Sequence, residues 1–325
     1  MQYIKDESVD LVVTSPPYPG VEMWDECFSS QSEIIRKSIE NGIYLRAWQE
    51  MHKILDNVWS EVIRVVKPGG LVCINIGDAT RTINDVFQLY SNHSRIIEYF
   101  VNNGFVCLPD ILWRKRTNSP NKFMGSGMLP AGAYVTLEHE YILVFRKGGK
   151  RVFSKEEKDI RQRSAYFYSE RNEWFSDVWE LMGVSQKGVK GSRERNASYP
   201  IEIPYRLINM YSIQGDVVLD PFGGLGTTML AAIILGRNSL SVEIDKVLCE
   251  YMKDRAITFE DYDTYYNDRI NKQEKFIRNE VDKGKDLYYN ENMKLSVKTR
   301  QEQKLIIPQV KDVERVEDYI ICEYI

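Results

Sequence analysis

Apolar residues recur along this chain in two alternating spacings. Short runs rich in valine, isoleucine and leucine predict buried strands, and longer stretches with apolar residues every three or four positions predict helices. We expect strands over residues 10–14, 71–77, 106–113, 140–147, 216–220 and 238–245. We expect helices over residues 33–66 with an interruption near Asn41-Gly42, over 94–104 and 227–235, and after Ile201 and Asp245. This alternation predicts an α/β fold with a mostly parallel sheet flanked by helices.

Two segments depart from the pattern. The stretch after residue 146 is polar and aromatic without clear periodicity to about Arg195, which indicates an inserted region. The tail after residue 255 is rich in tyrosine, lysine, asparagine and glutamate; we expect a helix to about residue 285 and a last strand within 318–325. The predicted parts are therefore 1–146, an insertion at 147–195, 196–255 as a continuation of the first part, and an extension at 256–325.

The composition narrows the class of protein. A hydrophobic content of 43% over 325 residues supports a substantial core. No run of about 18 apolar residues occurs, and the first residues lack the apolar stretch of a signal peptide, so we expect a cytoplasmic protein without a membrane segment. The five cysteines are scattered and never form a C-x-x-C pair, which argues against disulfides and a zinc site. We expect no metal.

Charge is unevenly distributed along the chain. The net charge is −4, yet residues 111–200 contain 17 lysines and arginines against 10 acidic residues. The rest of the chain contains 26 basic and 37 acidic residues. The basic middle is either a solvated surface or a surface that faces a polyanion, and charge alone leaves both open.

The stretch VVTSPPYPG, residues 12–20, ends a predicted strand in Ser15, Pro16, Pro17 and Tyr18. Proline fixes φ and pushes the residue before it to extended geometry. One interpretation is a stiff turn after a strand. The other is a pre-organised loop that presents backbone carbonyls and an aromatic face to a ligand.

The stretch VVLDPFGGLGTTMLAAIIL begins at residue 217 and joins a strand ending in Asp220 to an apolar helix through a glycine-rich turn. Gly224 and Gly226 allow close approach of the backbone to a ligand, and the next strand ends in Glu243, at the spacing of an acid that binds ribose hydroxyls. The turn lacks the third glycine of a dinucleotide site, so S-adenosylmethionine, which has no phosphate, fits better. A turn that only packs a helix on a sheet is the alternative.

Together, TSPPY and DPFGGLGTT resemble the DNA amino-methyltransferases, in the permuted group whose catalytic motif precedes the cofactor motif. The resemblance covers most of residues 8–250 and includes KPGGLVCINIGD, EHEYILVFRKG, DVWE and SYPIEIPYRLI. It implies a doubly wound Rossmann-like methyltransferase sheet, with 1–146 as the catalytic part, 147–195 as the target-recognition region and 196–255 as the part that binds S-adenosylmethionine. The partner that the resemblance implies is double-stranded DNA. Serine before Pro-Pro is typical of enzymes that act on N4 of cytosine, and aspartate of those that act on N6 of adenine.

The run PGVEMWDE resembles a subgroup from restriction-modification systems that acts on CTAG sites, which implies a cognate restriction endonuclease. Family members usually begin with a further strand that contributes to the adenine pocket. Here only five residues precede the segment DESVDL, which follows this strand in the family, so we expect either that the strand lies outside this sequence or that the tail after residue 255 replaces it.

The chemistry assigns roles to the two motifs. An aromatic amine is a poor nucleophile, so the Ser15 hydroxyl and Pro16 carbonyl would accept its hydrogens, Pro17 would stiffen the loop, and Tyr18 would stack on a flipped base. Predicted cofactor-binding residues are Tyr199, Pro200, Asp220, Phe222, Gly224, Gly226, Thr227, Thr228 and Glu243. Predicted DNA-binding residues are Arg114, Lys115, Arg116, Lys122, Arg161, Arg163, Lys187, Lys190 and Arg193.

Several alternatives stay open at this point. Trp24 and Asp25 either cover the flipped base or staple the loop to the core, Trp113 belongs to the base pocket or the core, and His139 is predicted to be structural. Neither a Pro-Cys dipeptide nor a Glu-Asn-Val triplet occurs, which argues against methylation at cytosine C5. The rival functions are N6-adenine methylation, amino-methylation of RNA or protein, a nicotinamide-dependent oxidoreductase and a non-catalytic DNA-binding protein.

Overall fold

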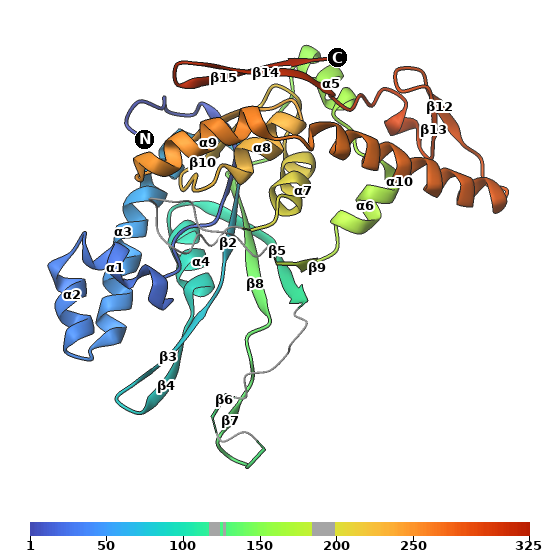
Figure 1. Ribbon diagram of the computed structural model, residues 1–325. Coiled ribbons are helices and arrows are strands. Elements are labelled where there is room, and N and C mark those ends of the chain that lie inside the picture. Colours follow the sequence, from blue (N-terminus) through green and yellow to red (C-terminus); the bar gives the residue numbers. More distant parts are fainter. Residues whose placement is uncertain (117–123, 126–127, 184–198) are drawn as a thin grey trace.

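A seven-stranded sheet with the strand order β11-β10-β1-β2-β8-β5-β9 forms the centre of the protein (Figure 1). The structure, a computed structural model, describes residues 1–116, 124–125, 128–183 and 199–325. The strands are β1 (Val9–Thr14), β2 (Val66–Ile76), β5 (Phe105–Arg116), β8 (His139–Lys147), β9 (Val178–Met182), β10 (Val217–Asp220) and β11 (Asn238–Ser241). Strand β8 is antiparallel to both of its neighbours, and the other pairs are parallel. The predicted α/β fold is confirmed.

Successive apolar side chains of the strands point to opposite faces of this sheet, and both faces are buried. In β8, Leu143 and Phe145 point into one core, whereas Ile142 and Val144 point into the other. The first core is closed by α3 (Tyr44–Val65) and α4 (Asn92–Asn102). The second is closed by α6 (Tyr168–Trp174), α7 (Glu202–Tyr211) and α8 (Thr227–Ile234). Helices on both faces make the sheet doubly wound.

The helical hairpin after β1 follows the sequence closely. The short elements η1 (Glu22–Trp24) and α1 (Asp25–Ser29) lead into α2 (Glu33–Glu40), which ends where the interruption is predicted. Gly42 adopts φ +69°, a left-handed conformation that suits glycine and lets the chain turn into α3. The predicted break at Asn41-Gly42 is confirmed.

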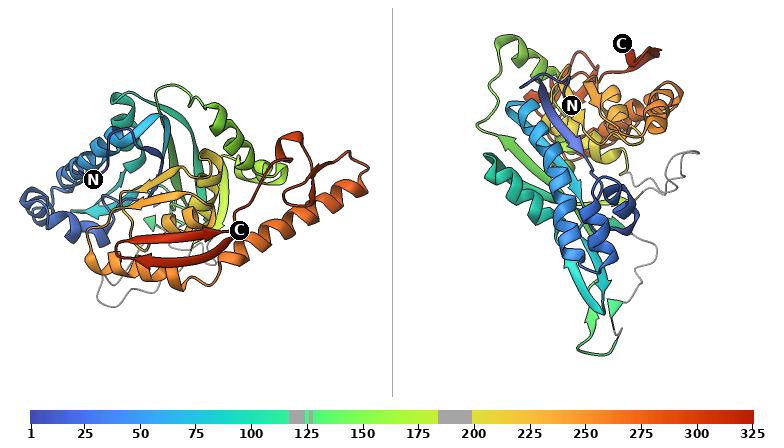
Figure 2. Two further views of the ribbon diagram at one scale, coloured as in Figure 1. Left: turned by 90° about the horizontal axis from the view of Figure 1, so that it is seen from above. Right: turned by 90° about the vertical axis from the view of Figure 1, so that its left-hand side faces the viewer.

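Two hairpins that the periodicity does not predict form an arm beyond the sheet (Figures 1 and 2). They are β3 (Ala79–Ile83) with β4 (Val86–Tyr90), and β6 (Met124–Gly125) with β7 (Ala133–Tyr134). The rings of Phe87 and Tyr134 stack with centroids 4.4 Å apart and join the two hairpins. Asn84 and Asp85 both have positive φ, as the turn of a tight hairpin requires, so Asn-Asp was the signal for β3–β4.

In its described residues, the region predicted as an insertion, 147–195, contributes a strand to the main sheet. Its described part contains α5 (Lys155–Arg163), α6 and β9. Strand β9 pairs in parallel with β5, from Leu112 opposite Val178 to Arg116 opposite Met182, so it belongs to the main sheet. Helix α6 covers the same sheet. A five-residue edge strand carries too little periodicity to be recognised from the sequence.

The residues after 255 pack as part of the same body. Helices α9 (Lys246–Thr258) and α10 (Tyr262–Asp282) lead to β12 (Tyr288–Asn290), β13 (Leu295–Val297) and η2 (Arg300–Glu302). Phe167 is buried against Val297 and Leu305, and Arg269 binds Glu170 with N–O distances of 2.5 and 2.8 Å. The predicted last strand is confirmed as β15 (Tyr319–Tyr324), but it pairs with β14 (Val310–Val316) outside the main sheet.

A search of the described residues finds no helix that is both long enough and apolar enough to cross a membrane.

A buried ion cluster ties the segment after β8 to the amino ends of β1 and β10. The Arg151 guanidinium lies 2.6 Å from Asp216 and 3.5 Å from Asp10, and Lys67 donates to Asp10 at 2.7 Å. The side chains of Asp10 and Asp216 are only 4% and 6% exposed. Removing the guanidinium would leave two buried carboxylates short of a counterion.

We therefore predict that Arg151→Met lowers the free energy of unfolding by roughly 2–3 kcal/mol, because breaking a buried pair strands a charge. The matched variant Lys155→Met removes an exposed cation at the start of α5 and should change stability by less than about 0.5 kcal/mol. Urea unfolding measures both. Equal effects of the two substitutions would contradict the structural role of the cluster.

Candidate active site

Five strands deliver polar side chains to one edge of the sheet. Strand β1 lies in parallel between β10 and β2, so the loop at Ser15, the turn after Asp220 and the end of β2 at Asn75 meet there. Strand β8 runs the opposite way and begins at this edge, which brings in Glu140; β5 ends there and brings in Lys115. The two motifs singled out in the sequence thus lie side by side.

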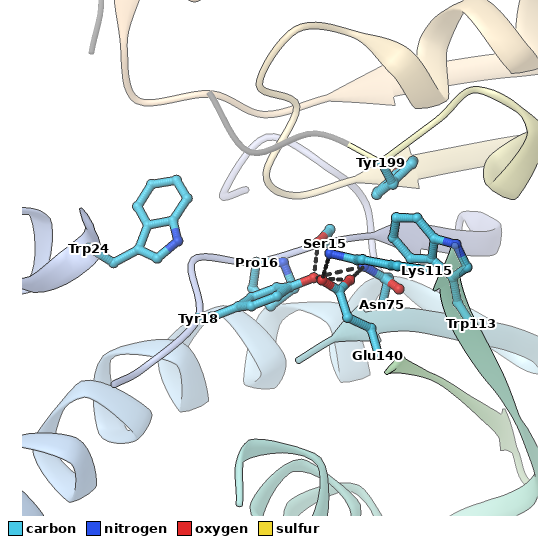
Figure 3. A pocket seen from close by; sticks show the side chains of 9 residues that line it. All are labelled: Ser15, Pro16, Tyr18, Trp24, Asn75, Trp113, Lys115, Glu140 and Tyr199. Atoms are coloured by element: carbon cyan, nitrogen blue, oxygen red, sulfur yellow. Dashed lines mark hydrogen bonds and ion pairs between the residues drawn. The ribbon is translucent and has the colours of Figure 1, made fainter. Parts of the chain in front are cut away.

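A small cavity of about 60 Å³ opens at this edge (Figure 3). It is lined by Ser15, Pro16, Tyr18, Trp24, Asn75, Trp113, Lys115, Glu140 and Tyr199. Three of the four predicted catalytic residues line it; Pro17 does not. Two predicted residues from other groups, Lys115 and Tyr199, join them.

The polar side chains of the cavity form one hydrogen-bonded cluster (Figure 3). The Tyr18 hydroxyl donates to Glu140 Oε2 at 2.8 Å and lies 3.0 Å from Ser15 Oγ. Asn75 Nδ2 donates to the Tyr18 hydroxyl and to Glu140 Oε2, both at 2.7 Å. Lys115 forms an ion pair with Glu140 Oε1. The Glu140 carboxylate therefore holds three side chains at once.

The cluster fixes the direction of its hydrogen bonds. Burial, followed by the nearby Glu140 carboxylate, raises the pKa of Tyr18 well above its usual value, so Tyr18 keeps its proton. Because that proton is donated to Glu140, the Ser15 hydroxyl must be the donor in its contact with Tyr18. Ser15 Oγ lies 3.4 Å from Asn75 Nδ2, a weak donor contact, and keeps an acceptor lone pair for the cavity that it lines.

Asn75 and Glu140 are the residues that the sequence analysis missed. Both are buried and polar, with exposures of 3% and 9%, although each belongs to a strand rich in apolar residues. Such positions are costly unless they are paired, and this was the available signal. Asn75 Oδ1 is buried without a hydrogen bond to any described residue, because its amide nitrogen is directed to the carboxylate.

The structure places the three residues near the loop whose roles the sequence leaves open. Asp25 staples the loop to the core, since it accepts a hydrogen bond from Tyr44 at 2.6 Å and pairs with Arg81. Trp24 lines the cavity and also packs against the first core, so both of its predicted roles stay open. Trp113 belongs both to the cavity, which it lines, and to the core. It is only 2% exposed and donates a hydrogen bond to the Leu181 carbonyl at 3.0 Å.

The glycine-rich turn is anchored by Asp220. Its carboxylate accepts hydrogen bonds from Thr14 at 2.6 Å, from Thr228 at 2.7 Å and from the Phe222 amide at 3.0 Å. Burial raises the pKa of Asp220, and the two hydroxyls partly offset that effect. Tyr199 reaches Thr228 at 2.5 Å and also lines the cavity, so it connects the turn to the Ser15 cluster.

The end of β11 places a second carboxylate beside this turn. Glu243 accepts from the Gly224 amide at 2.8 Å and from the amides of Ile244 and Asp245 at 2.9 Å. It is half-buried, so its oxygens keep access to a ligand. Thr227 begins α8 next to the turn, and Pro200 precedes α7 beside Tyr199.

The structure separates the predicted DNA-binding residues. Arg114 and Lys115 lie at the active-site edge, where Arg114 pairs with Glu138 and Glu180 at 3.2 and 3.6 Å. Arg161 and Arg163 lie on α5, which packs at the opposite, amino edge of the sheet. The side chains of Arg116, Lys122, Lys187, Lys190 and Arg193 lie outside the described residues.

Among the described side chains, no group of three or more histidine, cysteine or acidic residues is arranged to hold a metal ion.

Two glycines with left-handed backbones test how tightly the turn is built. Gly226 has φ +75°, and a Cβ there would lie 2.3 Å from Met252 Cγ; Gly104 has φ +84° with nothing within 4 Å. We predict that Gly104→Ala costs roughly 1 kcal/mol of stability from its backbone alone. Gly226→Ala should cost about 1–3 kcal/mol more because it also overpacks against Met252. Urea unfolding gives both values, and similar losses would show that Met252 yields freely.

Comparison with known proteins agrees with this geometry. A family model for N6/N4 methyltransferases, described as DNA methylase, matches residues 9–254. The type II methyltransferase M.MthZI of Methanothermobacter thermautotrophicus is 53% identical over 94% of this chain and 86% of its own length. M.MjaI of Methanocaldococcus jannaschii, also named a type II methyltransferase, is 55% identical over 76% of this chain and 85% of its own.

A solved structure of a Thermus thermophilus protein, described as a putative DNA modification methylase complexed with S-adenosyl-L-methionine, superimposes with a TM-score of 0.61. Its sequence identity is 30%, and the match covers 78% of this chain and 88% of that one. The family model spans both motifs at the carboxyl edge of the sheet. This chain belongs to the N6/N4 family of DNA methylases.

Proposed function

We propose that this protein transfers a methyl group from S-adenosylmethionine to N4 of cytosine in double-stranded DNA, as the modification enzyme of a restriction-modification system. The observation that carries the proposal is Ser15, held as a hydrogen-bond acceptor beside the glycine-rich turn. The type II methyltransferases that resemble the chain support the biological setting.

The residues at the turn fit S-adenosylmethionine. Glu243 offers a half-buried carboxylate suited to ribose hydroxyls, and Gly224 and Gly226 leave the backbone open to close approach. The similar Thermus protein was solved with this ligand. Bound there, S-adenosylmethionine supplies an electrophilic methyl group. Tyr199 and Thr228, which link the turn to the Ser15 cluster, would hold the two sites in register.

The Ser15 loop would prepare the base amine as a nucleophile. Delocalisation into the ring makes the lone pair of an exocyclic amine poorly reactive. Ser15 Oγ and the Pro16 carbonyl, held by the stiff Pro16-Pro17 unit, accept the two amine hydrogens and turn the lone pair out of conjugation. A base within the duplex cannot reach this cavity, so the target must be flipped out, at a cost of a few kcal/mol that stacking and hydrogen bonds recover.

The same cluster gives the amine proton a path. Transfer would form a bond between the amine nitrogen and the methyl carbon and would break the bond from that carbon to the sulfonium sulfur, which would leave as a neutral thioether. The nitrogen, then positively charged, must lose one hydrogen. The Ser15 oxygen takes this proton and passes its own to the Tyr18 oxygen, and the Tyr18 proton moves to Glu140, which becomes a neutral carboxylic acid. Lys115 stabilises the carboxylate before transfer. We assign Tyr18 this relay role in addition to the stacking predicted from the sequence.

Serine at position 15 favours cytosine over adenine. A neutral hydroxyl stands where adenine-specific members of the family typically carry an aspartate. The PGVEMWDE run extends the proposal to CTAG sites, with a restriction endonuclease that acts on the same sequence. N6-methylation of adenine is the alternative function.

Nucleoside mass spectrometry tests the proposal. Duplexes with and without a CTAG site are incubated with the enzyme and S-adenosylmethionine carrying a labelled methyl group, and then digested. We predict label in N4-methylcytosine. N6-methyladenine as the sole product would contradict the cytosine assignment and leave the mechanism intact. Labelled 5-methylcytosine, or no labelled nucleoside, would contradict both.

Conservative substitutions test the relay. Tyr18→Phe keeps the ring but removes the hydroxyl. Glu140→Gln keeps the shape, but its amide oxygen would turn to Lys115 and its nitrogen to Tyr18, which reverses the hydrogen-bond chain. We predict that each lowers the single-turnover methylation rate at least roughly tenfold, as for loss of one preorganised polar contact.

Glu138→Gln is the matched control, because Glu138 precedes β8 and pairs with Arg114 at 3.2 Å outside the cavity. We expect its single-turnover rate to stay within about twofold of the parent, as for an exposed ion pair. If Tyr18→Phe methylates at the parent rate, Tyr18 acts only through its ring and the relay is wrong.

A further inference from the structure

A second groove lies at the amino edge of the sheet, opposite the active site. Its volume is about 1090 Å³. Its floor includes Asp10 near the amino end of β1 and Gly69 in the amino half of β2, and its walls include residues 151–171, 209–213 and 299–304. In Figure 1, α5 lies at the upper end of the sheet, whereas the β3–β4 hairpin after β2 points downward. No role in methyl transfer accounts for this groove.

The ionisable residues that line the groove are strongly biased to one sign. Among its described lining residues the only carboxylate is Asp10, and the cluster of Arg151 and Lys67 neutralises it. The other charged lining residues are all cations: Lys158, Arg161, Arg171, Arg300 and Lys304. In the described part of the chain the first four form no ion pair, and Lys304 lies 3.8 Å from Asp159. Five cations therefore gather in one groove of a protein of net charge −4.

Aromatic rings hold two of these arginines in place. The Arg161 guanidinium lies 4.7 Å from the centre of the Phe153 ring, and that of Arg300 lies 5.6 Å from the Tyr288 ring. A ring positions a guanidinium without neutralising its charge, so the N–H donors at its rim stay available. Planar donors of this kind suit phosphate oxygens.

We infer that this groove binds the phosphate backbone of a second stretch of DNA, independently of sequence. The five cations are spread over two walls of the groove, so they match a ligand that carries several separate negative charges. DNA is such a ligand, because its phosphates repeat along its length. The six-residue strand β1 alone separates the two edges by about 20 Å. A base flipped into the Ser15 cavity therefore belongs to a different stretch from the one in the groove. The groove would keep the enzyme on long DNA between methylation events.

Charge reversal tests this inference. The double variant Arg161→Glu/Arg300→Glu changes both walls of the groove. The matched control Lys275→Glu/Lys285→Glu makes the same change in net charge at exposed positions in α10 and just after it. Binding to a long poly(dA)·poly(dT) duplex, which offers no cytosine, is measured by filter binding over a salt series without S-adenosylmethionine. Methylation of a short duplex with one target site is measured in parallel.

Log affinity decreases as log salt increases. For the groove variant we expect this slope to become shallower by about 2, since each lost phosphate contact contributes roughly 0.9 to its magnitude. Affinity at low salt should fall at least roughly tenfold, the control should bind like the parent, and methylation of the short duplex should persist. Arg161→Gln/Arg300→Gln should show a smaller loss in the same direction, which separates lost contacts from repulsion.

An unchanged slope in the groove variant, or an equal loss in the control, would overturn the inference. The inference would also be overturned if a mononucleotide or poly-glutamate bound in the groove and long DNA did not, because the site would then serve a nucleotide or an acidic protein. A parent enzyme that methylates no DNA would refute the proposed function, yet the binding comparison would still decide the role of the groove.

Discussion

The Glu140 carboxylate is the charge on which the active-site edge depends. It accepts from Tyr18 and Asn75 and pairs with Lys115, so residues from β2, β5, β8 and the loop after β1 converge on one group. Its ionised state makes Tyr18 a donor toward Glu140 and thereby makes Ser15 an acceptor toward the cavity. In the proposed mechanism, the reactivity of a base amine would follow from one buried carboxylate on β8, the strand that runs antiparallel to both of its neighbours.

The sheet makes this convergence possible. Strand β1 pairs with β10 on one side and with β2 on the other, which places the Ser15 loop between the glycine-rich turn and Asn75. Thr14 and Thr228 both donate to Asp220, so the loop and the turn share one anchor. Two motifs about 200 residues apart lie side by side because parallel strands end at the same edge.

Local sequence signals predicted the parts whose folding is decided locally. The apolar runs of β1, β2, β8 and β10, the break at Gly42 and the motifs at Ser15 and Asp220 all carry such signals. Asn75 and Glu140 escaped because each is one polar residue in an apolar strand, and only tertiary pairing reveals their partners. Arg114 and Arg161 both lie in the basic segment 111–200 and share one predicted role in DNA binding, yet the sheet places them at opposite edges.

The central claim is the direction of the hydrogen bonds from Ser15 through Tyr18 to Glu140, and neutron diffraction from a deuterium-exchanged crystal measures it directly. The account predicts the Tyr18 deuterium on the line to Glu140 Oε2, the Ser15 deuterium on the line to the Tyr18 oxygen, and no deuterium on Glu140. A Ser15 deuterium pointing into the cavity, or a protonated Glu140, would contradict it.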